Sequence, residues 1–250
     1  MGSAIAAAGQ GAAAFGRDLP GDQIYTRIRE AILRNRLGPG TKLAEVKLCD
    51  IFGVNREVVR RVLIRLASDG IVDYYPKRGA FVASPTPEQV AHVRDARIAI
   101  ETFLVADLAG RATEEGLRSL DEIAERQVEA QRVGDRDIAV ELSGAFHVRL
   151  AEMGGNPLCT KYLLELTALT CLAIVKFGVD PNKGCLHQDH FAVTAALRRG
   201  EGAEAAEVMR THLGGVHTAV LEQSRRTPRS WDLSGILTDP PDATDQLRQG

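Results

Sequence analysis

Two arginines lie four residues apart in the stretch GVNREVVRRVL, at positions 56 and 60. On a helix, residues with this spacing lie on the same face, one turn apart. A guanidinium group can donate two parallel hydrogen bonds to O6 and N7 of guanine, so Arg56 and Arg60 could read base edges in duplex DNA. The alternative interpretation is a solvated stripe of charge on a surface helix. Further basic residues that would suit contacts to phosphates or to the minor groove are Lys47, Arg61, Arg65, Lys77 and Arg78.

The segments that must position these arginines follow a recognisable order. Apolar residues at helical spacing predict a helix over residues 22–36, which the Gly and Pro of LGPGTKL end, and a short helix follows at about 44–52. Asn55 is a good N-cap for a helix that runs to about Asp69. The β-type runs IVDYY and AFVAS flank PKRG and predict a hairpin with Gly79 in its turn. Helix, helix, tight turn, helix and hairpin is the order of a winged helix-turn-helix.

After the linker SPTP the sequence changes to long amphipathic helices with almost no β-type pattern. Short loops containing glycine separate the helices, which is typical of an antiparallel bundle. The predicted helices span about 87–111, 114–132, 136–153, 157–177, 182–199 and 202–226. We therefore expect a mainly α protein, with a winged helix-turn-helix over residues 22–84 and a six- or seven-helix bundle over 85–226. Residues 1–21 are predicted to be a flexible arm and residues 227–250 a loose tail.

The charge is distributed unevenly between these two parts. Residues 22–84 contain 12 Lys and Arg against 7 Asp and Glu, whereas residues 85–250 contain 18 against 25. A basic N-terminal part followed by an acidic C-terminal part indicates two modules with different partners. The 44% hydrophobic content excludes a disordered chain. Four cysteines without a CxxC pair indicate reduced thiols in a cytoplasmic protein, and no unbroken apolar run reaches the ~18 residues of a membrane span.

The first module resembles a known family. IYTRIREAILRNRLGPGTKLAEVKLCDIFGVNREVVRRVLIRLASDGIVDYYPKRGAFV is similar to the DNA-binding domain of GntR-type bacterial repressors. The resemblance covers the LGPG turn, FGV, the Arg56/Arg60 pair, the Leu-x-x-Asp-Gly before the wing and the Arg-Gly wing turn at Gly79. It implies a nucleoid-associated regulator that binds a palindromic double-stranded DNA operator as a homodimer, with one recognition helix in each half-site.

The sequence departs from the family pattern at the start of the recognition helix. Where the family usually has Ser-Arg-Thr-Pro-Val-Arg-Glu, this chain has Asn55, Glu57, Val58 and Arg61 in place of Ser, Thr, Pro and Glu. Asn55 can still cap the helix. Glu57 brings a carboxylate near DNA, which repels phosphate but can accept a hydrogen bond from cytosine N4. We therefore expect an operator that differs from the family's usual one.

The helical body resembles the FadR-type effector domain called FCD. The resemblance is carried by Asp95-Ala96-Arg97 with Glu101, by AFHVRLAEMGGNPL and by DHFAVTAALRRGEGAEAAEVMRTHL. It implies a cavity for a small organic acid and, in many members, a divalent metal held by an Asp and three His. The histidines correspond to positions 147, 190 and 212, while Ser143 stands where the Asp is expected.

The spacing of the histidines is compatible with a metal site. His190 and His212 lie on successive helices joined by a tight turn, so an antiparallel pair can bring their imidazoles face to face. With His147 they would suit Zn²⁺ or Ni²⁺ and leave a coordination position open. Ser143 is a poor ligand, although it could hydrogen-bond a bound water or ligand. The alternative is a polar cavity that holds only water.

Arg97 is the second candidate for ligand binding in the helical body. It could form an ion pair with Glu101 at i,i+4, or it could point inward and bind a carboxylate. Two rival functions remain beside a ligand-responsive repressor. One is a metal-dependent hydrolase or lyase that uses the three histidines, and the other is a winged helix that contacts only proteins. The sequence places no Glu or Asp by motif as a general base near the histidines, which disfavours an enzyme.

Overall fold

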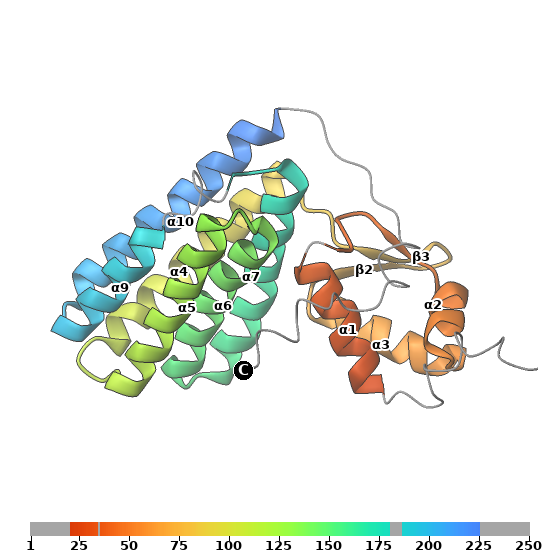
Figure 1. Ribbon diagram of the computed structural model, residues 1–250, viewed down its shortest axis with the longest axis horizontal. Helices are drawn as coiled ribbons and strands as arrows, with labels where there is room; N and C mark the ends of the chain where they lie inside the picture. The colour runs from red at the N-terminus through yellow and green to blue at the C-terminus, as the bar shows by residue number, and fades with distance from the viewer. Residues whose placement is uncertain (1–20, 35, 181–186, 226–250) are drawn as a thin grey trace, which may run out of the picture.

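The structure is a computed structural model that describes residues 21–34, 36–180 and 187–225, and these form two lobes (Figure 1). The mainly α fold predicted from the sequence, a winged helix-turn-helix followed by a helical bundle, is confirmed. The N-terminal lobe contains α1 (Gly21–Leu33), β1 (Lys42–Leu43), α2 (Glu45–Phe52), α3 (Arg56–Ser68), β2 (Val72–Tyr75) and β3 (Gly79–Val82). The C-terminal lobe contains α4 (Pro87–Leu108), α5 (Glu114–Arg132), α6 (Arg136–Gly154), α7 (Pro157–Phe177), α9 (His187–Arg199) and α10 (Gly202–Ser224). The predicted arm before α1, the tail 227–250 and the predicted start of a helix at Asn182 lie outside the described residues.

The N-terminal lobe is built around the apolar faces of α1 and α3. Ile24 and Ile28 of α1 and Leu63 and Leu66 of α3 are completely buried in one core. Val58 packs against this core, but its side chain is only half-buried. The reason is its position in the first turn of α3, close to the exposed end of the helix. This core holds α3 so that its opposite face points to solvent.

The wing is a three-stranded antiparallel sheet with the order β1-β3-β2. The predicted hairpin is present, with Tyr75 opposite Gly79 in the β2–β3 register. Lys77 and Gly79 in its turn have φ angles of 64° and 92°, and a positive φ is uncommon for a residue with a side chain. The sequence did not predict β1, because two residues are too short to show an alternating pattern.

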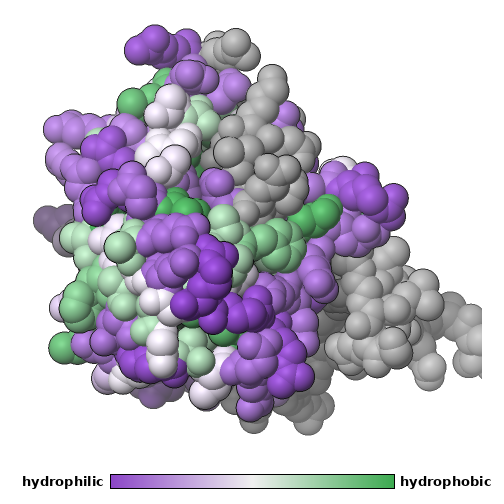
Figure 2. Space-filling model, turned by 90° about the vertical axis from the view of Figure 1, so that its left-hand side faces the viewer, coloured by the Kyte–Doolittle hydropathy of each residue, from purple (hydrophilic) through white to green (hydrophobic). Residues whose placement is uncertain are grey.

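Four of the described bundle helices begin at a residue whose side chain caps the helix. Thr86 and Gln89 form a reciprocal capping box at the start of α4, and Thr113, Asp135 and Asn156 cap α5, α6 and α7. α10 packs along α4, and α5 packs along α6 (Figure 1). Figure 2 shows the bundle face on the left of Figure 1, where hydrophilic and apolar residues are interspersed. The capped, antiparallel helices bring segments far apart in sequence to the same level of the bundle.

α7 joins the two lobes. Its residues Ala168 and Leu172 are part of the apolar core of the N-terminal lobe. The Lys176 ammonium donates to the carbonyl oxygens of Ser84 and Pro85, at 3.3 and 2.9 Å. A Cβ atom on Gly70 would collide with the Glu165 side chain, so the loop after α3 also runs close to α7. The lobes therefore share a packed interface in addition to their covalent linker.

α7 is also the one described helix that is long and apolar enough to cross a membrane by length and composition. Its mean hydropathy reaches 1.6 in an 18-residue window, 44% of which is buried inside the protein. Its sequence contains no unbroken apolar run of that length, because Lys161, Glu165 and Lys176 interrupt the apolar residues. Core helices of soluble proteins pass the same test, and α7 packs against α4 and α6.

Candidate nucleic-acid interface and metal centre

The exposed face of α3 presents the two arginines predicted to read DNA. The Asn55 side-chain oxygen accepts a hydrogen bond from the Val58 N–H at 3.1 Å and starts the helix there, as the sequence predicted. The side chains of Arg56 and Arg60 are 70% and 64% exposed. Both guanidinium groups therefore project from the first two turns of the helix, which are the turns that reach base edges in a helix-turn-helix.

Two residues that the sequence analysis did not single out hold these arginines. Tyr74 on β2 donates its hydroxyl hydrogen to Glu45 Oε1 at 3.0 Å, and Arg60 Nε donates to the Tyr74 oxygen at 3.4 Å. Glu45 lies 3.8 Å from Arg56 Nε and 3.9 Å from Arg60 Nε. Such contacts restrict the arginine rotamers while leaving the remaining guanidinium N–H groups exposed. Glu45 and Tyr74 thus pre-orient the arginines.

A groove of about 590 Å³ runs between α3, the start of α2 and the wing. Its basic lining consists of Lys42, Arg56, Arg60, Lys77 and Arg78. Val46 also lines the groove and is 54% exposed, which gives an apolar surface of the kind that contacts a thymine methyl group. The wing residues predicted to bind DNA, including Gly79, therefore line the same groove as the recognition arginines.

The other predicted DNA contacts differ in how far they remain available. Arg61 is exposed and lies 3.7 Å from Glu57, its neighbour one turn earlier. Arg65 points back to α1, where it pairs with Asp22 at 2.6 Å and stacks over the Tyr25 ring at 3.9 Å. Arg65 thus ties α3 to α1 in this structure, and because its side chain is 53% exposed, the phosphate contact suggested by the sequence stays a prediction. Lys47 lies half-buried on α2.

In the C-terminal lobe, the three predicted histidines meet inside the bundle. His147 comes from α6, His190 from α9 and His212 from α10, and all three are buried. One nitrogen from each lies within 4.8 Å of the other two. The ring centroids of His190 and His212 are 4.7 Å apart, as the antiparallel arrangement of their helices predicted.

Each imidazole has its Nδ1 atom bound by an oxygen from another side chain. His147 pairs with Glu101 Oε2 at 2.6 Å, His190 with Gln127 Oε1 at 2.9 Å and His212 with Asp189 Oδ2 at 3.2 Å. Since these oxygens accept, each Nδ1 carries the hydrogen and Nε2 keeps its lone pair. Carboxylate or amide partners of this kind orient metal-binding histidines. No local sequence pattern marks Gln127 or Asp189 as a partner of a histidine, and the sequence indicated Glu101 only as a partner of Arg97.

The charges around His147 favour a neutral imidazole beside an ionised carboxylate. Burial alone would raise the pKa of Glu101, but Arg97 and His147 reverse this effect and hold the pKa at about 2. Burial lowers the pKa of His147 to about 4, against the attraction of Glu101. A neutral imidazole is the form that binds metals.

Arg97 forms the ion pair with Glu101, and its side chain is buried inside the bundle. Its Nε atom donates to Glu101 Oε1 at 2.7 Å, and its Nη1 atom donates to the Thr170 hydroxyl at 3.1 Å. Nη2 is buried and has no hydrogen-bond partner among the described residues. Ser143 is buried on α6 one turn before His147.

The donor set fits a divalent transition metal. Three imidazole nitrogens with fixed tautomers would provide three ligands, and Zn²⁺ at about 2.1 Å from each would bring them roughly 3.4 Å apart. The 4.8 Å limit means that small side-chain rotations would reach this separation. A fourth position would stay open, because Ser143 does not supply the carboxylate.

Both lobes match models of known protein families. A model of the bacterial regulatory proteins of the gntR family matches residues 20–82, and a model of the FCD domain matches residues 92–215. The chain is 28% identical to the HTH-type transcriptional repressor RspR of Escherichia coli K12 over 84% of its length and 92% of the relative. It is 30% identical to an HTH-type transcriptional regulator in an unstable DNA locus of Streptomyces ambofaciens, over 77% and 81%.

A solved structure gives the same result for the fold. The crystal structure of a GntR transcriptional regulator from Rhodococcus sp. RHA1 superimposes with a TM-score of 0.72 at 22% identity. The match covers 81% of this chain and 97% of that one. The fold of the two lobes is therefore shared with that solved structure.

Proposed function

The chain belongs to the GntR family of bacterial transcriptional regulators that bind DNA, and from this premise we propose how it acts. As a homodimer in the cytoplasm, it binds a palindromic operator and represses transcription, until a small organic acid in the FCD domain changes the affinity for DNA. The observation that carries the DNA-binding part is the Arg56/Arg60 pair, held outward by Glu45 and Tyr74 beside a basic wing. The two recognition helices of a dimer would enter major grooves of successive half-sites.

The first experiment maps the operator. Footprinting on the promoter beside the protein's own gene should reveal a protected palindrome, and affinity should fall steeply with salt because phosphate contacts release counterions. Arg56→Ala should weaken binding and relax base preference at one position of each half-site. Arg126→Ala, an exposed position on α5, is a control with the same change of charge. No preference for any duplex over random competitor at physiological salt would overturn the proposal.

The effector site would lie at the three histidines. Their Nε2 atoms would hold Zn²⁺ or Ni²⁺, which supplies an open coordination position for a carboxylate oxygen. Arg97 and Ser143 lie on the helices around this centre and would bind the rest of the acid. The acid must bind the DNA-competent and incompetent forms with different affinity, because otherwise it shifts no equilibrium.

The second experiment tests the effector site by itself. Release of the operator by a panel of organic acids should be measured with and without Zn²⁺, using the wild type and His147→Ala. We expect His147→Ala to retain operator binding and to lose both metal binding and the effector response. A variant that responds to the acid like the wild type would exclude the histidines as the effector site.

The enzyme alternative gains little support from the arrangement of the site. Glu101, the carboxylate nearest His147, already accepts from Arg97 and His147, so it is not available as a general base. The relatives described above are transcriptional regulators. Turnover of a candidate acid that disappears in His147→Ala would favour an enzyme over a sensor.

A further inference from the structure

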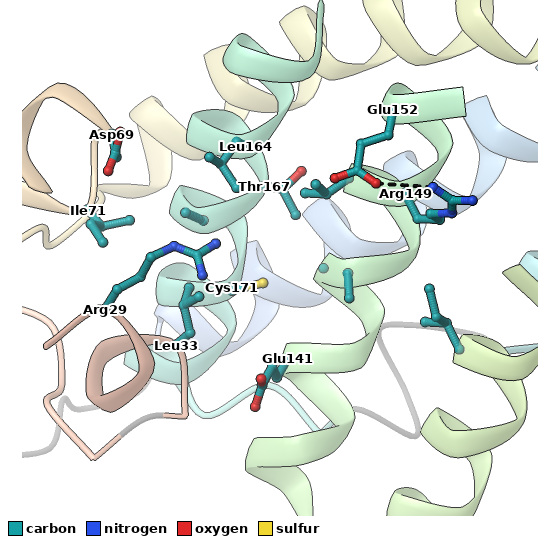
Figure 3. A pocket seen from close by; sticks show the side chains of 15 residues that line it. Arg29, Leu33, Asp69, Ile71, Glu141, Arg149, Glu152, Leu164, Thr167 and Cys171 are labelled. Carbon is teal, nitrogen blue, oxygen red and sulfur yellow. Dashed lines mark hydrogen bonds and ion pairs between the residues drawn. The ribbon is translucent and has the colours of Figure 1, made fainter. Parts of the chain in front are cut away.

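A pocket of about 340 Å³ lies between the two lobes, away from the three histidines (Figure 3). One wall comes from α1 and from the end of α3, with Arg29, Leu33, Asp69 and Ile71, and the other comes mainly from α6 and α7. The volume is at the lower end of the range for small-molecule sites, roughly 300–1,000 Å³. A ligand in this pocket would touch both the DNA-binding lobe and the helical bundle.

The ionisable residues of the pocket leave one cation without a partner. Asp69 accepts from Tyr25 at 2.6 Å, Glu141 pairs with Arg34 at 3.2 Å, and Glu152 pairs with Arg149 at 3.3 Å. Arg29 extends from α1 into the pocket toward α7 (Figure 3). Its guanidinium group forms no hydrogen bond or ion pair with any residue that the structure describes. The three acids each have a partner nearer than Arg29, although Glu141 Oε2 makes no hydrogen bond among the described residues and Arg29 attracts the Glu141 charge. The guanidinium group of Arg29 keeps its N–H donors for a bound anion.

A buried hydroxyl on the opposite wall also lacks a hydrogen-bond partner among the described residues. Thr167 on α7 is 3% exposed, and its Oγ1 atom has no hydrogen-bond partner among the described residues. Burying a hydroxyl without a partner costs free energy, so such a group is explained when a ligand completes its bonding. The remaining wall is largely apolar, with Leu33, Ile71, Val148, Leu164 and Cys171.

We propose that this pocket is a second ligand site, which binds a small monocarboxylate with an apolar body and couples its binding to DNA affinity. The carboxylate pairs with Arg29, the Thr167 hydroxyl provides a further polar contact, and the apolar body fills the space between α1, α6 and α7. A volume of 340 Å³ accommodates on the order of ten non-hydrogen atoms, at about 30 Å³ each. Coupling follows because the ligand contacts both lobes, so its affinity depends on how the DNA-binding lobe sits against the bundle.

The test uses the full chain, stripped of metal with EDTA, and 3-phenylpropanoate as the probe. Binding is measured by isothermal titration calorimetry, with the uncharged 3-phenylpropanamide as the matched ligand. We expect the amide to bind roughly ten- to hundredfold more weakly, because it cannot form the charge-assisted pair with Arg29. Equal affinity for the acid and the amide, or no binding of the acid, would overturn the proposal.

Variants then locate the site. Arg29→Met should reduce affinity for 3-phenylpropanoate by a similar factor, and Ala145→Phe should block the pocket. Thr167→Val removes only a hydroxyl that has no partner, so it should fold normally and bind the probe several-fold more weakly, by roughly 1 kcal/mol on a 1.4 kcal/mol-per-decade scale. Arg126→Met should bind the probe like the wild type. Binding lost in His147→Ala and retained in Arg29→Met would place the probe at the histidines instead.

Coupling is measured separately, as the affinity for the operator with and without saturating 3-phenylpropanoate. We expect a change in the wild type that is absent in Arg29→Met. Unchanged affinity in the wild type would refute the coupling, even if the probe binds. Because operator binding by the protein without ligand is a separate measurement, failure of this inference can be distinguished from failure of the proposed function.

Discussion

The two lobes use arginine in opposite ways. Arg56 and Arg60 are largely exposed and are held by only a few long contacts to Glu45 and Tyr74. Arg97 is 3% exposed, and two of its nitrogens are bound by Glu101 and Thr170. An exposed guanidinium costs little to maintain and keeps its hydrogen bonds for a partner. A buried guanidinium needs anionic or hydrogen-bonding partners inside the folded protein, so the residues around it contribute to the stability of the bundle.

This difference predicts where mutations act. In the bundle, removal of one charge should affect stability first, because the remaining partner stays buried. On α3, removal of one charge should affect binding and leave the fold intact. The comparison fails if either kind of substitution shows the effect expected for the other.

The largest effect is expected for Glu101→Gln. This change leaves Arg97 buried without an anionic partner, and breaking a buried pair in this way typically costs about 3–5 kcal/mol. Urea unfolding in EDTA should therefore show a free energy of unfolding lower by about 3 kcal/mol. Glu125→Gln, on the exposed face of α5, is the matched control and should change it by less than about 0.5 kcal/mol.

The double variant Arg97→Met/Glu101→Leu sharpens this prediction. Removing both charges avoids the uncompensated ion, and such replacements are often close to neutral. We expect it to be more stable than Glu101→Gln. A double variant that is less stable than the single one would mean that the ion pair itself, rather than the orphaned charge, carries the stability.

The next largest effect is expected for Arg60→Ala in DNA binding. A bidentate contact to guanine contributes roughly 1–3 kcal/mol of discrimination, so operator affinity should fall about ten- to hundredfold. The free energy of unfolding should change by less than about 0.5 kcal/mol, because the side chain is 64% exposed. Fluorescence anisotropy with a labelled operator measures the affinity. Arg60→Ala with wild-type affinity and specificity would refute base reading by this residue.

A smaller effect is expected at the start of α3. Asn55→Ala removes the side-chain acceptor for the Val58 N–H, and loss of an N-cap costs about 1 kcal/mol. Asn55→Ser keeps an acceptor at this position and should remain within about 0.5 kcal/mol of the wild type. Urea unfolding distinguishes the two variants. Equal loss in both would show that Asn55 acts through some contact other than the cap.

The sequence predicted the elements better than their polar networks. The helices of both lobes follow from apolar periodicity and capping residues, and the meeting of His190 with His212 follows from two antiparallel helices joined by a short turn. The partners of these histidines did not follow. Gln127 and Asp189 approach them only after α5, α9 and α10 have packed, and a contact across 63 residues leaves no local pattern.

Arg65 has partners in the N-terminal lobe that the sequence also did not predict. Its place on α3 suggested a phosphate contact, because four arginines occur on that helix. The structure turns it toward Asp22 and Tyr25, since α1 packs beside that part of α3. Spacing along a helix gives the face on which a residue lies, but the neighbouring helix determines whether that face remains free.

The Tyr25–Asp69 hydrogen bond is partly buried, so it lies between the exposed contacts of Arg56 and Arg60 and the buried Arg97–Glu101 ion pair. Its removal should give the smallest effect. Burial, and then the hydrogen bond to Asp69 at 2.6 Å, raises the pKa of Tyr25 to about 12. The folded state therefore favours the protonated phenol. Its contribution is fully present below the ordinary pKa of about 10, and it is lost as pH rises through 12.

Tyr25→Phe should consequently lower the free energy of unfolding at pH 8 by about 1 kcal/mol or less, because the ring is partly solvated. The difference between wild type and variant should shrink between pH 10 and pH 12, in urea titrations at several pH values. Tyr162→Phe, at a position that is 51% exposed, is the control and should show no such trend. If the difference in free energy of unfolding between wild type and Tyr25→Phe stayed constant up to pH 12, the stabilisation would not come from the hydrogen bond between the phenol and Asp69. The contribution of a polar contact to stability would then no longer increase with its burial, which is the difference inferred between the two lobes.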